Sequence, residues 1–89
     1  MSYWINAKGF PGYEVSNDGY VRNKYTKQIL KPYLNRPGGY YRVELNGTEV
    51  YVHQIVASSF YVNYKKGKRI KHIDKNKLNN DWRNLDFKR

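Results

Sequence analysis

The side chains best suited to chemistry gather in the last twenty residues, IKHIDKNKLNNDWRNLDFKR. This segment holds one imidazole, His72, close to the carboxylate of Asp74 and to the amide-rich run 79–81. Cysteine is absent from the chain, which excludes disulfides and thiolate metal sites. Any metal would therefore be held by imidazole, carboxylate, amide or phosphate groups.

Charge is the second chemical signal. Seventeen Lys and Arg stand against seven Asp and Glu, which gives a net charge of +10 in 89 residues. Because like charges oppose folding, we expect an anionic partner, with nucleic acid favoured and a membrane surface or an acidic protein as the alternatives. No membrane partner is expected, because the chain has neither a basic amphipathic pattern nor an apolar run of spanning length. The N-terminus lacks signal-peptide order, so we expect a cytoplasmic protein.

Ten basic residues are the predicted phosphate contacts, while polar strand residues would read a groove. They are Arg22, Lys24, Lys27, Arg36, Arg42, Lys65, Lys66, Lys68, Arg69 and Lys71. The dense run 65–69 has an alternative interpretation as a solvated connector. Charge density alone does not separate the two.

The elements that position these residues are short strands in the first half of the chain. Turn signals recur at 9–12, 17–19, 36–39 and 46–47, where Gly, Pro, Asn and Asp break any helical period. Between them we predict strands at 20–24, 28–33, 40–45 and 48–52, which are rich in aromatic and β-branched residues. The Asn46-Gly47 step predicts a tight hairpin. Ten Tyr, three Phe and two Trp supply most of the large packing surfaces.

The pattern changes to a helical period after residue 52. Val52, Ile55, Val56, Ser59 and Phe60 share one helical face, which predicts a helix of about two turns lying on the sheet. Further on we expect short strands at 70–73 and 85–87, with a capping or turn cluster at 79–81. The chain is thus one α+β domain over 1–89, with an antiparallel sheet motif in 1–51 and a further unit in 52–89.

Two stretches resemble a known family. GFPGYEVSNDGYVR, followed by GYYRVEL, is similar to the modular DNA-binding motif at the front of many phage and intron-encoded endonucleases. VHQIVASSF and HIDKNKLNNDWRNL resemble the segments that open the HNH, or His-Me finger, nuclease core. The pieces stand in family order at family-like spacing and cover essentially the whole chain. The chain is therefore identified as similar to the HNH homing endonucleases of phages and introns.

This resemblance implies an N-terminal antiparallel sheet followed by a ββα finger. In the family, the finger presents a histidine to a scissile phosphate beside one divalent cation. By position, His72 matches the general base that activates water, and Asn84 matches the asparagine that supports the finger loop. His53 matches a helix-start histidine with a packing or capping role. The resemblance also implies a phage-infected or prophage-bearing bacterial host, and Mg²⁺ or Mn²⁺ as the cofactor of an active enzyme.

Two departures from the family pattern concern the metal. The residue before the catalytic histidine is usually an Asp or Asn ligand, whereas here it is Lys71. The last family signature, on a closing helix, would fall beyond Arg89, so the finger is expected to be shortened. Asp74, which the family uses structurally, is then the remaining metal-ligand candidate. The Lys71 charge would either replace the cation and hold a phosphate or point into solvent.

Three functions follow from these expectations. The first is a DNA-binding protein of the HNH homing-endonuclease lineage with impaired or lost cleavage and no cofactor. The second is a metal-dependent nicking endonuclease, or a fragment of one, that uses His72 as general base. The third is a small phage protein that binds and inhibits a host protein.

Overall fold

The computed structural model describes residues 2–36, 38–65 and 67–87. Its elements, in chain order, are β1 (Trp4–Asn6), β2 (Tyr13–Ser16), β3 (Val21–Asn23), β4 (Tyr33–Asn35), β5 (Tyr40–Leu45), β6 (Thr48–Tyr51), α1 (Val52–Phe60), β7 (Ile70–His72), the 3-10 helix η1 (Trp82–Asn84) and β8 (Leu85–Phe87). The α+β class expected from the sequence is confirmed.

Within the described residues the strands form three antiparallel sheets: two take the place of the one N-terminal sheet expected, and the third is the two-stranded part of the expected finger. Their orders are β1-β2-β3, β4-β5-β6 and β7-β8. The predicted hairpin joins β5 to β6, with φ of 53° at Asn46 and 79° at Gly47. Positive φ at both central residues matches the twist of the flanking strands, which explains the Asn-Gly pair.

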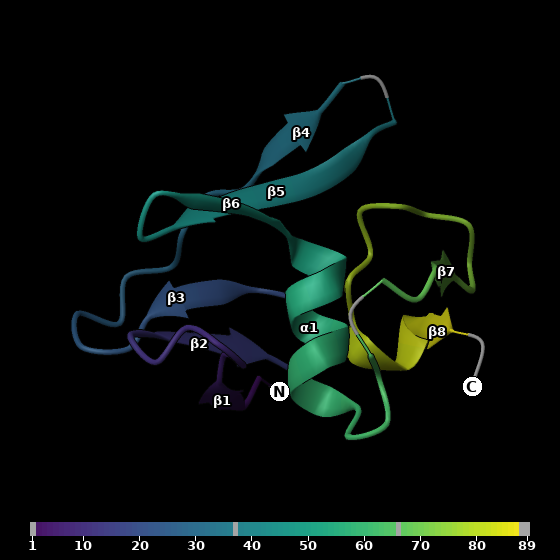
Figure 1. Ribbon diagram of the computed structural model, residues 1–89. Helices are drawn as coiled ribbons and strands as arrows, with labels where there is room; N and C mark the ends of the chain where they lie inside the picture. The colour runs from purple at the N-terminus through teal and green to yellow at the C-terminus, as the bar shows by residue number, and fades with distance from the viewer. Residues whose placement is uncertain (1, 37, 66, 88–89) are drawn as a thin grey trace.

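Helix α1 occupies the centre of the molecule (Figure 1). It packs against β2, β5, β6 and η1, so it joins the N-terminal sheets to the β7–β8 hairpin. Val52, Ile55 and Val56 are buried on its inner face, as the spacing predicted. They meet Val15, Val21, Val43, Leu45 and Leu85 from the strands in one hydrophobic core.

Aromatic residues complete the packing between α1 and the β7–β8 hairpin. The rings of Phe60 and Trp82 stack with centroids 6.0 Å apart, and Tyr61 meets Phe87 edge-on at 5.2 Å. The Tyr61 hydroxyl lies 2.9 Å from the carbonyl of Trp82 and 3.0 Å from that of Leu85. These contacts hold the C-terminal hairpin against the helix.

The predicted strand at 28–33 is wrong, and two strands were missed. Within 28–33 only Ile29 forms an isolated bridge, to Arg22, and β4 begins at residue 33. Lys27, with φ of 63°, and Pro32 limit regular pairing there. The missed strands β1 and β2 span only three and four residues between turns, too few for an alternating pattern.

The core position of Leu45 predicts a large stability loss. Leu45 is fully buried, whereas Leu34 on β4 is 42% exposed. We expect Leu45→Ala to lower the free energy of unfolding by about 2–5 kcal/mol, because it removes buried methyl groups and leaves a cavity. Leu34→Ala is the matched control, with about 1 kcal/mol or less. Urea denaturation measures both, and equal losses would contradict the assigned core.

Candidate functional site

His72 lies at the end of β7 with its ring almost fully buried. The side chain is 6% exposed, and its Nε2 lies 2.8 Å from Oδ1 of Asn80, which is itself 3% exposed. A carbonyl oxygen can only accept a hydrogen bond, so His72 Nε2 carries the proton. The lone pair of the neutral ring is therefore on Nδ1. A histidine fixed in this tautomer can act as a base through Nδ1.

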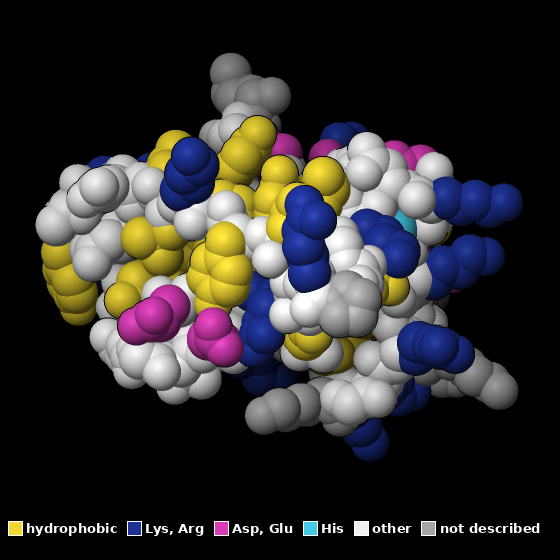
Figure 2. Space-filling view, turned by 90° about the horizontal axis from the view of Figure 1, so that it is seen from above, with side chains coloured by type: hydrophobic (Ala, Val, Ile, Leu, Met, Phe, Trp, Pro, Cys, Tyr) yellow, Lys and Arg dark blue, Asp and Glu magenta, His cyan; other side chains and the backbone are white. Residues whose placement is uncertain are grey.

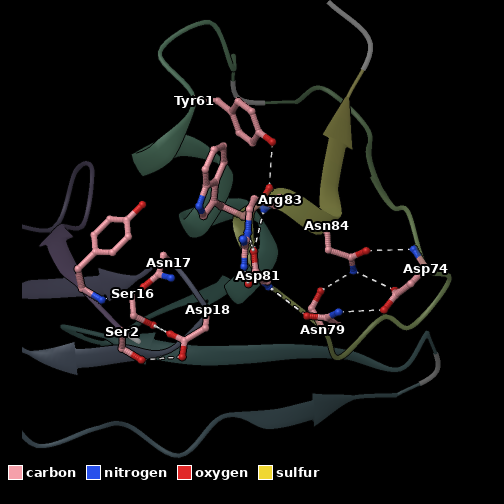
Figure 3. Close-up of polar contacts among 12 residues, drawn as sticks. Ser2, Ser16, Asn17, Asp18, Tyr61, Asp74, Asn79, Asp81, Arg83 and Asn84 are labelled. Atoms are coloured by element: carbon pink, nitrogen blue, oxygen red, sulfur yellow. Dashed lines mark hydrogen bonds and ion pairs between the residues drawn. The ribbon is translucent and has the colours of Figure 1, made fainter.

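The loop after His72 is closed by Asp74 and Asn84 (Figure 3). Asn84 Nδ2 donates to Asp74 Oδ1 at 2.9 Å and to the carbonyl of Asn79 at 2.8 Å, while Asn84 Oδ1 accepts from the Asp74 backbone N–H at 3.0 Å. Asn79 Nδ2 and the Asn76 backbone N–H also donate to the Asp74 carboxylate. These hydrogen bonds, that from Asn79 foremost, lower the pKa of Asp74.

A wall of rings backs His72. His53, on the first turn of α1, lies with its ring centroid 5.4 Å from that of His72, and Tyr40 lies 4.9 Å from His53 and 5.9 Å from His72. Tyr51 completes the wall, 5.2 Å from His53. No side chain caps α1, so of the two roles expected for His53 the structure shows packing.

His53 is held in its neutral form. Its Nδ1 is buried, and no group among the described residues forms a hydrogen bond with it. Burial lowers the pKa of His53 to about 4, and the nearby charge of His72 acts in the same direction. A buried imidazole that stays uncharged packs against His72 as an aromatic ring.

Two adjoining clefts open beside this wall, with volumes of about 270 and 400 Å³. Tyr40, Arg69 and Ile70 line both. The larger cleft, hereafter the finger cleft, also has His72 in its lining, together with Lys71, Lys75 and Lys77. Lys77 Nζ donates to the carbonyl of Gly38 at 2.8 Å and lies 5.0 Å from the Tyr40 ring centroid. Figure 2 shows Lys and Arg side chains projecting around this end of the molecule, with a histidine visible among them.

The predicted phosphate contacts fall into two groups. In the first group, each cation already lies within 4.0 Å of a carboxylate oxygen. Arg22 Nε lies 2.8 Å from Glu14, with its guanidinium 4.1 Å from the Trp4 ring centroid, and Lys27 Nζ lies 3.5 Å from the same carboxylate. Arg42 pairs with Glu49 at 3.0 Å. The Arg22 and Arg42 pairs each link neighbouring strands within one sheet, β2 with β3 and β5 with β6.

The second group lies toward solvent. Arg36, Lys65, Arg69 and Lys71 are exposed, and Lys24 and Lys68 are partly buried. Lys66 lies outside the described residues. Of this group, the structure brings Arg69 and Lys71 to the finger cleft and Lys68 to the adjoining one.

The side chains around His72 do not make a complete site for a hard divalent cation. Within the described residues, no three His, Cys, Asp or Glu side chains group together. The Lys71 ammonium cannot act as a ligand, and Asp74 uses three of its roughly four acceptor positions to close the loop. Phosphate or further carboxylate oxygens would be needed to complete such a site.

Sequence reasoning missed several residues that form the site. Tyr40, Lys75 and Lys77 were not singled out, and Asn80 was predicted only as part of a capping or turn cluster at 79–81, not as a partner of His72. For Asn80 the available signal was an amide eight residues after His72, across a turn-rich loop. Nothing in the local sequence of Tyr40 points to His72.

Family models match both halves of the chain. The model described as the NUMOD4 motif matches residues 3–46, and the model described as HNH endonuclease matches residues 50–86. Together they leave only short stretches unmatched. Among the described residues, no helix has the length and apolar character needed to cross a membrane.

Curated relatives carry the same family names. The chain is 39% identical to an uncharacterized HNH endonuclease, L245, of Acanthamoeba polyphaga mimivirus over 98% of its length and 27% of the relative. It is 37% identical to DNA endonuclease I-HmuI of Bacillus phage SP01, over 92% of its length and 49% of that protein. It is 38% identical to the putative HNH homing endonuclease YosQ of the SPbeta prophage of Bacillus subtilis, over 82% of its length and 44% of that protein. The chain thus spans about half or less of these relatives.

A solved structure is also similar. It is described as "DNA binding and cleavage by the HNH homing endonuclease I-HmuI" and superposes with a TM-score of 0.83 at 35% sequence identity. The match covers 97% of this chain and 52% of the other. The likeness therefore extends over the two N-terminal sheets, helix α1 and the β7–β8 hairpin.

The low pKa of His53 predicts that stability falls below neutral pH. Because the folded-state pKa is about 4 and the ordinary value 6.5, the unfolded chain takes up a proton first as the pH falls through this interval. We expect the protein to lose about 1–2 kcal/mol between pH 7 and pH 5 through His53. In His53→Phe, which keeps a ring, this loss should be absent. Parallel denaturation curves of both proteins at the two pH values measure it, and an unchanged pH dependence would refute the assignment.

Proposed function

Because this chain belongs to the HNH homing endonuclease family, we propose that it binds double-stranded DNA with its finger cleft and that its capacity to cleave DNA is impaired. The similar solved structure is one of DNA binding and cleavage by I-HmuI. The observation that carries the proposal is the cleft itself, where Arg69, Lys71 and Lys75 surround the buried His72.

The distribution of charge supports this face over the N-terminal sheets. Arg22, Lys27 and Arg42 are already paired with Glu14 or Glu49, so a phosphate would compete with a carboxylate there. Among the described ion pairs, none involves Arg69, Lys71 or Lys75. These three cations can therefore release counterions from DNA without breaking an internal contact.

The loss of cleavage rests on the residues beside His72. Lys71 places an ammonium where the family has a metal ligand, and the Asp74 carboxylate is committed to Asn79, Asn84 and the loop backbone. In this proposal Lys71 supplies the positive charge that a cation would bring, and the finger holds a phosphate without cutting the chain. Asn84 supports the loop, and no metal cofactor takes part.

One observation favours a second candidate function, a nicking endonuclease. His72 keeps a geometry suited to a general base, because Asn80 fixes the proton on Nε2 and leaves Nδ1 to accept one from water. Mg²⁺ or Mn²⁺ would be needed, with Asp74 as the candidate carboxylate ligand and with further ligands beyond those that the described residues supply. For either function we infer the cytoplasm of an infected or prophage-bearing bacterium, and the phage and prophage relatives support this inference.

The salt dependence of binding to duplex DNA tests the cleft. If about five phosphates are neutralised, the logarithm of the affinity should fall with the logarithm of salt concentration with a slope of roughly −4 to −5. The double variant Arg69→Ala/Lys75→Ala should flatten the slope by about 2, since each lost phosphate contact removes about 0.9. Fluorescence anisotropy with a labelled duplex over a salt series gives these slopes.

The matched control removes the same charge elsewhere. Lys8 and Lys31 are exposed and do not line the finger cleft. Lys8→Ala/Lys31→Ala should leave the slope close to that of the unmodified protein. If both double variants change the slope equally, binding depends on net charge alone and the cleft is not the DNA-binding face.

A plasmid assay separates the two candidate functions. With supercoiled plasmid and either Mg²⁺ or Mn²⁺, we expect both the unmodified protein and His72→Ala to leave the plasmid supercoiled. The physical reason is the incomplete ligand set around His72. Nicking that disappears in His72→Ala would overturn the loss of cleavage and establish the second function.

A further inference from the structure

The turn at residues 16–19 is held rigidly by its own side chains. Asp18 accepts hydrogen bonds from the hydroxyls of Ser2 and Ser16, the first at 2.6 Å. The Ser16 carbonyl accepts the Gly19 N–H at 3.0 Å, and the Ser16 hydroxyl oxygen accepts the Tyr20 N–H at 2.9 Å. This turn belongs to the part of the chain that the NUMOD4 model matches, far in sequence from the finger.

The same turn is in direct contact with the finger loop, at Asn80 and Trp82. The carbonyl of Asn17 accepts the Trp82 N–H at 2.9 Å. Gly19, with φ of +96°, packs so closely on Asn80 that a Cβ at position 19 would lie 2.6 Å from the carbonyl carbon and oxygen of Asn80 and 2.8 Å from its Cβ. Only glycine fits this contact. In Figure 3, Asp81 is drawn between the turn residues Ser16, Asn17 and Asp18 and the pair Asp74 and Asn84.

Asn80 connects this contact to His72. Its backbone meets Gly19, and its side-chain oxygen accepts the His72 Nε2 proton at 2.8 Å. We propose that Gly19 is a positioning residue for His72, and that the turn at 16–19 sets the ring tautomer of His72 by fixing Asn80. This inference rests on the proposed function, because the imidazole of His72 lines the finger cleft that we propose to bind DNA.

The packing leaves Asn80 little freedom to adjust. Asn80 is buried, and its neighbours Asn79 and Asp81 are themselves tied down, Asn79 to the Asp74 carboxylate and Asp81 to the Arg83 N–H as the cap of η1. A side chain at position 19 must therefore displace Asn80. Hydrogen bonds weaken steeply as donor and acceptor separate or tilt, so His72 Nε2 would lose its acceptor.

The experiment observes the ring of His72 directly in the full chain. Two-bond ¹H–¹⁵N correlation spectra show which ring nitrogen of each histidine carries the proton. At pH 8 we expect His72 to be protonated on Nε2 in the unmodified protein. In Gly19→Ala the bias toward this tautomer should fall roughly five- to tenfold, the equilibrium effect of one ordinary hydrogen bond. The His53 ring pattern should not change.

Gly9→Ala is the matched control. Gly9 also has a positive φ, +83°, but no atom lies within 4 Å of a Cβ built there. Alanine at this position introduces similar backbone strain without touching the finger, so the His72 pattern should stay as in the unmodified protein. A His72 tautomer that responds equally to both substitutions, or to neither, would overturn the inference.

Two further variants keep the test decisive if Gly19→Ala does not fold. Asn80→Ala removes the acceptor and should abolish the Nε2 preference. Asp18→Ala loosens the turn without a clash and should weaken that preference. Protonation of His72 on Nδ1 in the unmodified protein, or no response to Asp18→Ala, would refute the proposal. Anisotropy with duplex DNA on the same samples separates the two failures, because DNA binding with an insensitive tautomer refutes only the positioning role.

Discussion

The hydrogen bond between His72 and Asn80 is the constraint on which the finger depends. Both side chains are almost completely buried, and a buried imidazole N–H without an acceptor would cost about 1–3 kcal/mol. Because Asn80 must reach the His72 ring to accept this hydrogen bond, the loop that follows His72 folds back toward the end of β7. Hydrogen bonds among Asp74, Asn79 and Asn84 then close the loop. Gly19 packs against Asn80, and the Asn17 carbonyl accepts the Trp82 N–H, so the turn at 16–19 also contacts the loop. The arrangement makes the two matched motifs neighbours in one packed structure.

The charge of +10 is arranged in two different ways. In the N-terminal sheets, Arg22 pairs with Glu14 and lies over the Trp4 ring, and Arg42 pairs with Glu49 and lies over the Tyr51 ring. Both side chains are partly buried, so they contribute to packing. Around the finger, Arg69, Lys71 and Lys75 stand in the open lining of a cleft. The net charge thus favours an anionic partner, and the internal ion pairs support the proposal that this partner meets the finger cleft.

The sequence predicted those features that depend on short-range order. The helix over Val52–Phe60 and the β5–β6 hairpin follow from a helical apolar period and an Asn-Gly turn, and both are confirmed. The division into separate sheets depends on which strands pair, and strands as short as Trp4–Asn6 carry no usable period. Through the resemblance, the sequence also directed attention to His72 and Asn84. The neighbours of His72 could not be predicted in the same way, because Gly19 and Asn80 meet only through the tertiary fold. The pairing of Arg22 with Glu14 was missed for a related reason, since Glu14 lies on β2, a strand that the sequence did not predict. Arg42 and Glu49 are not directly opposite each other in the predicted β5–β6 hairpin, so their ion pair depends on how far the side chains reach.

A titration of ¹⁵N-labelled protein with a short duplex, followed by amide chemical shifts in dilute buffer, tests the central claim most directly. If the finger cleft is the DNA-binding face, the largest shift changes should occur at Tyr40 and within residues 68–77, the segment that supplies most of the lining of the two clefts. Shifts confined to the exposed strand Tyr33–Asn35, or none at all, would contradict the account.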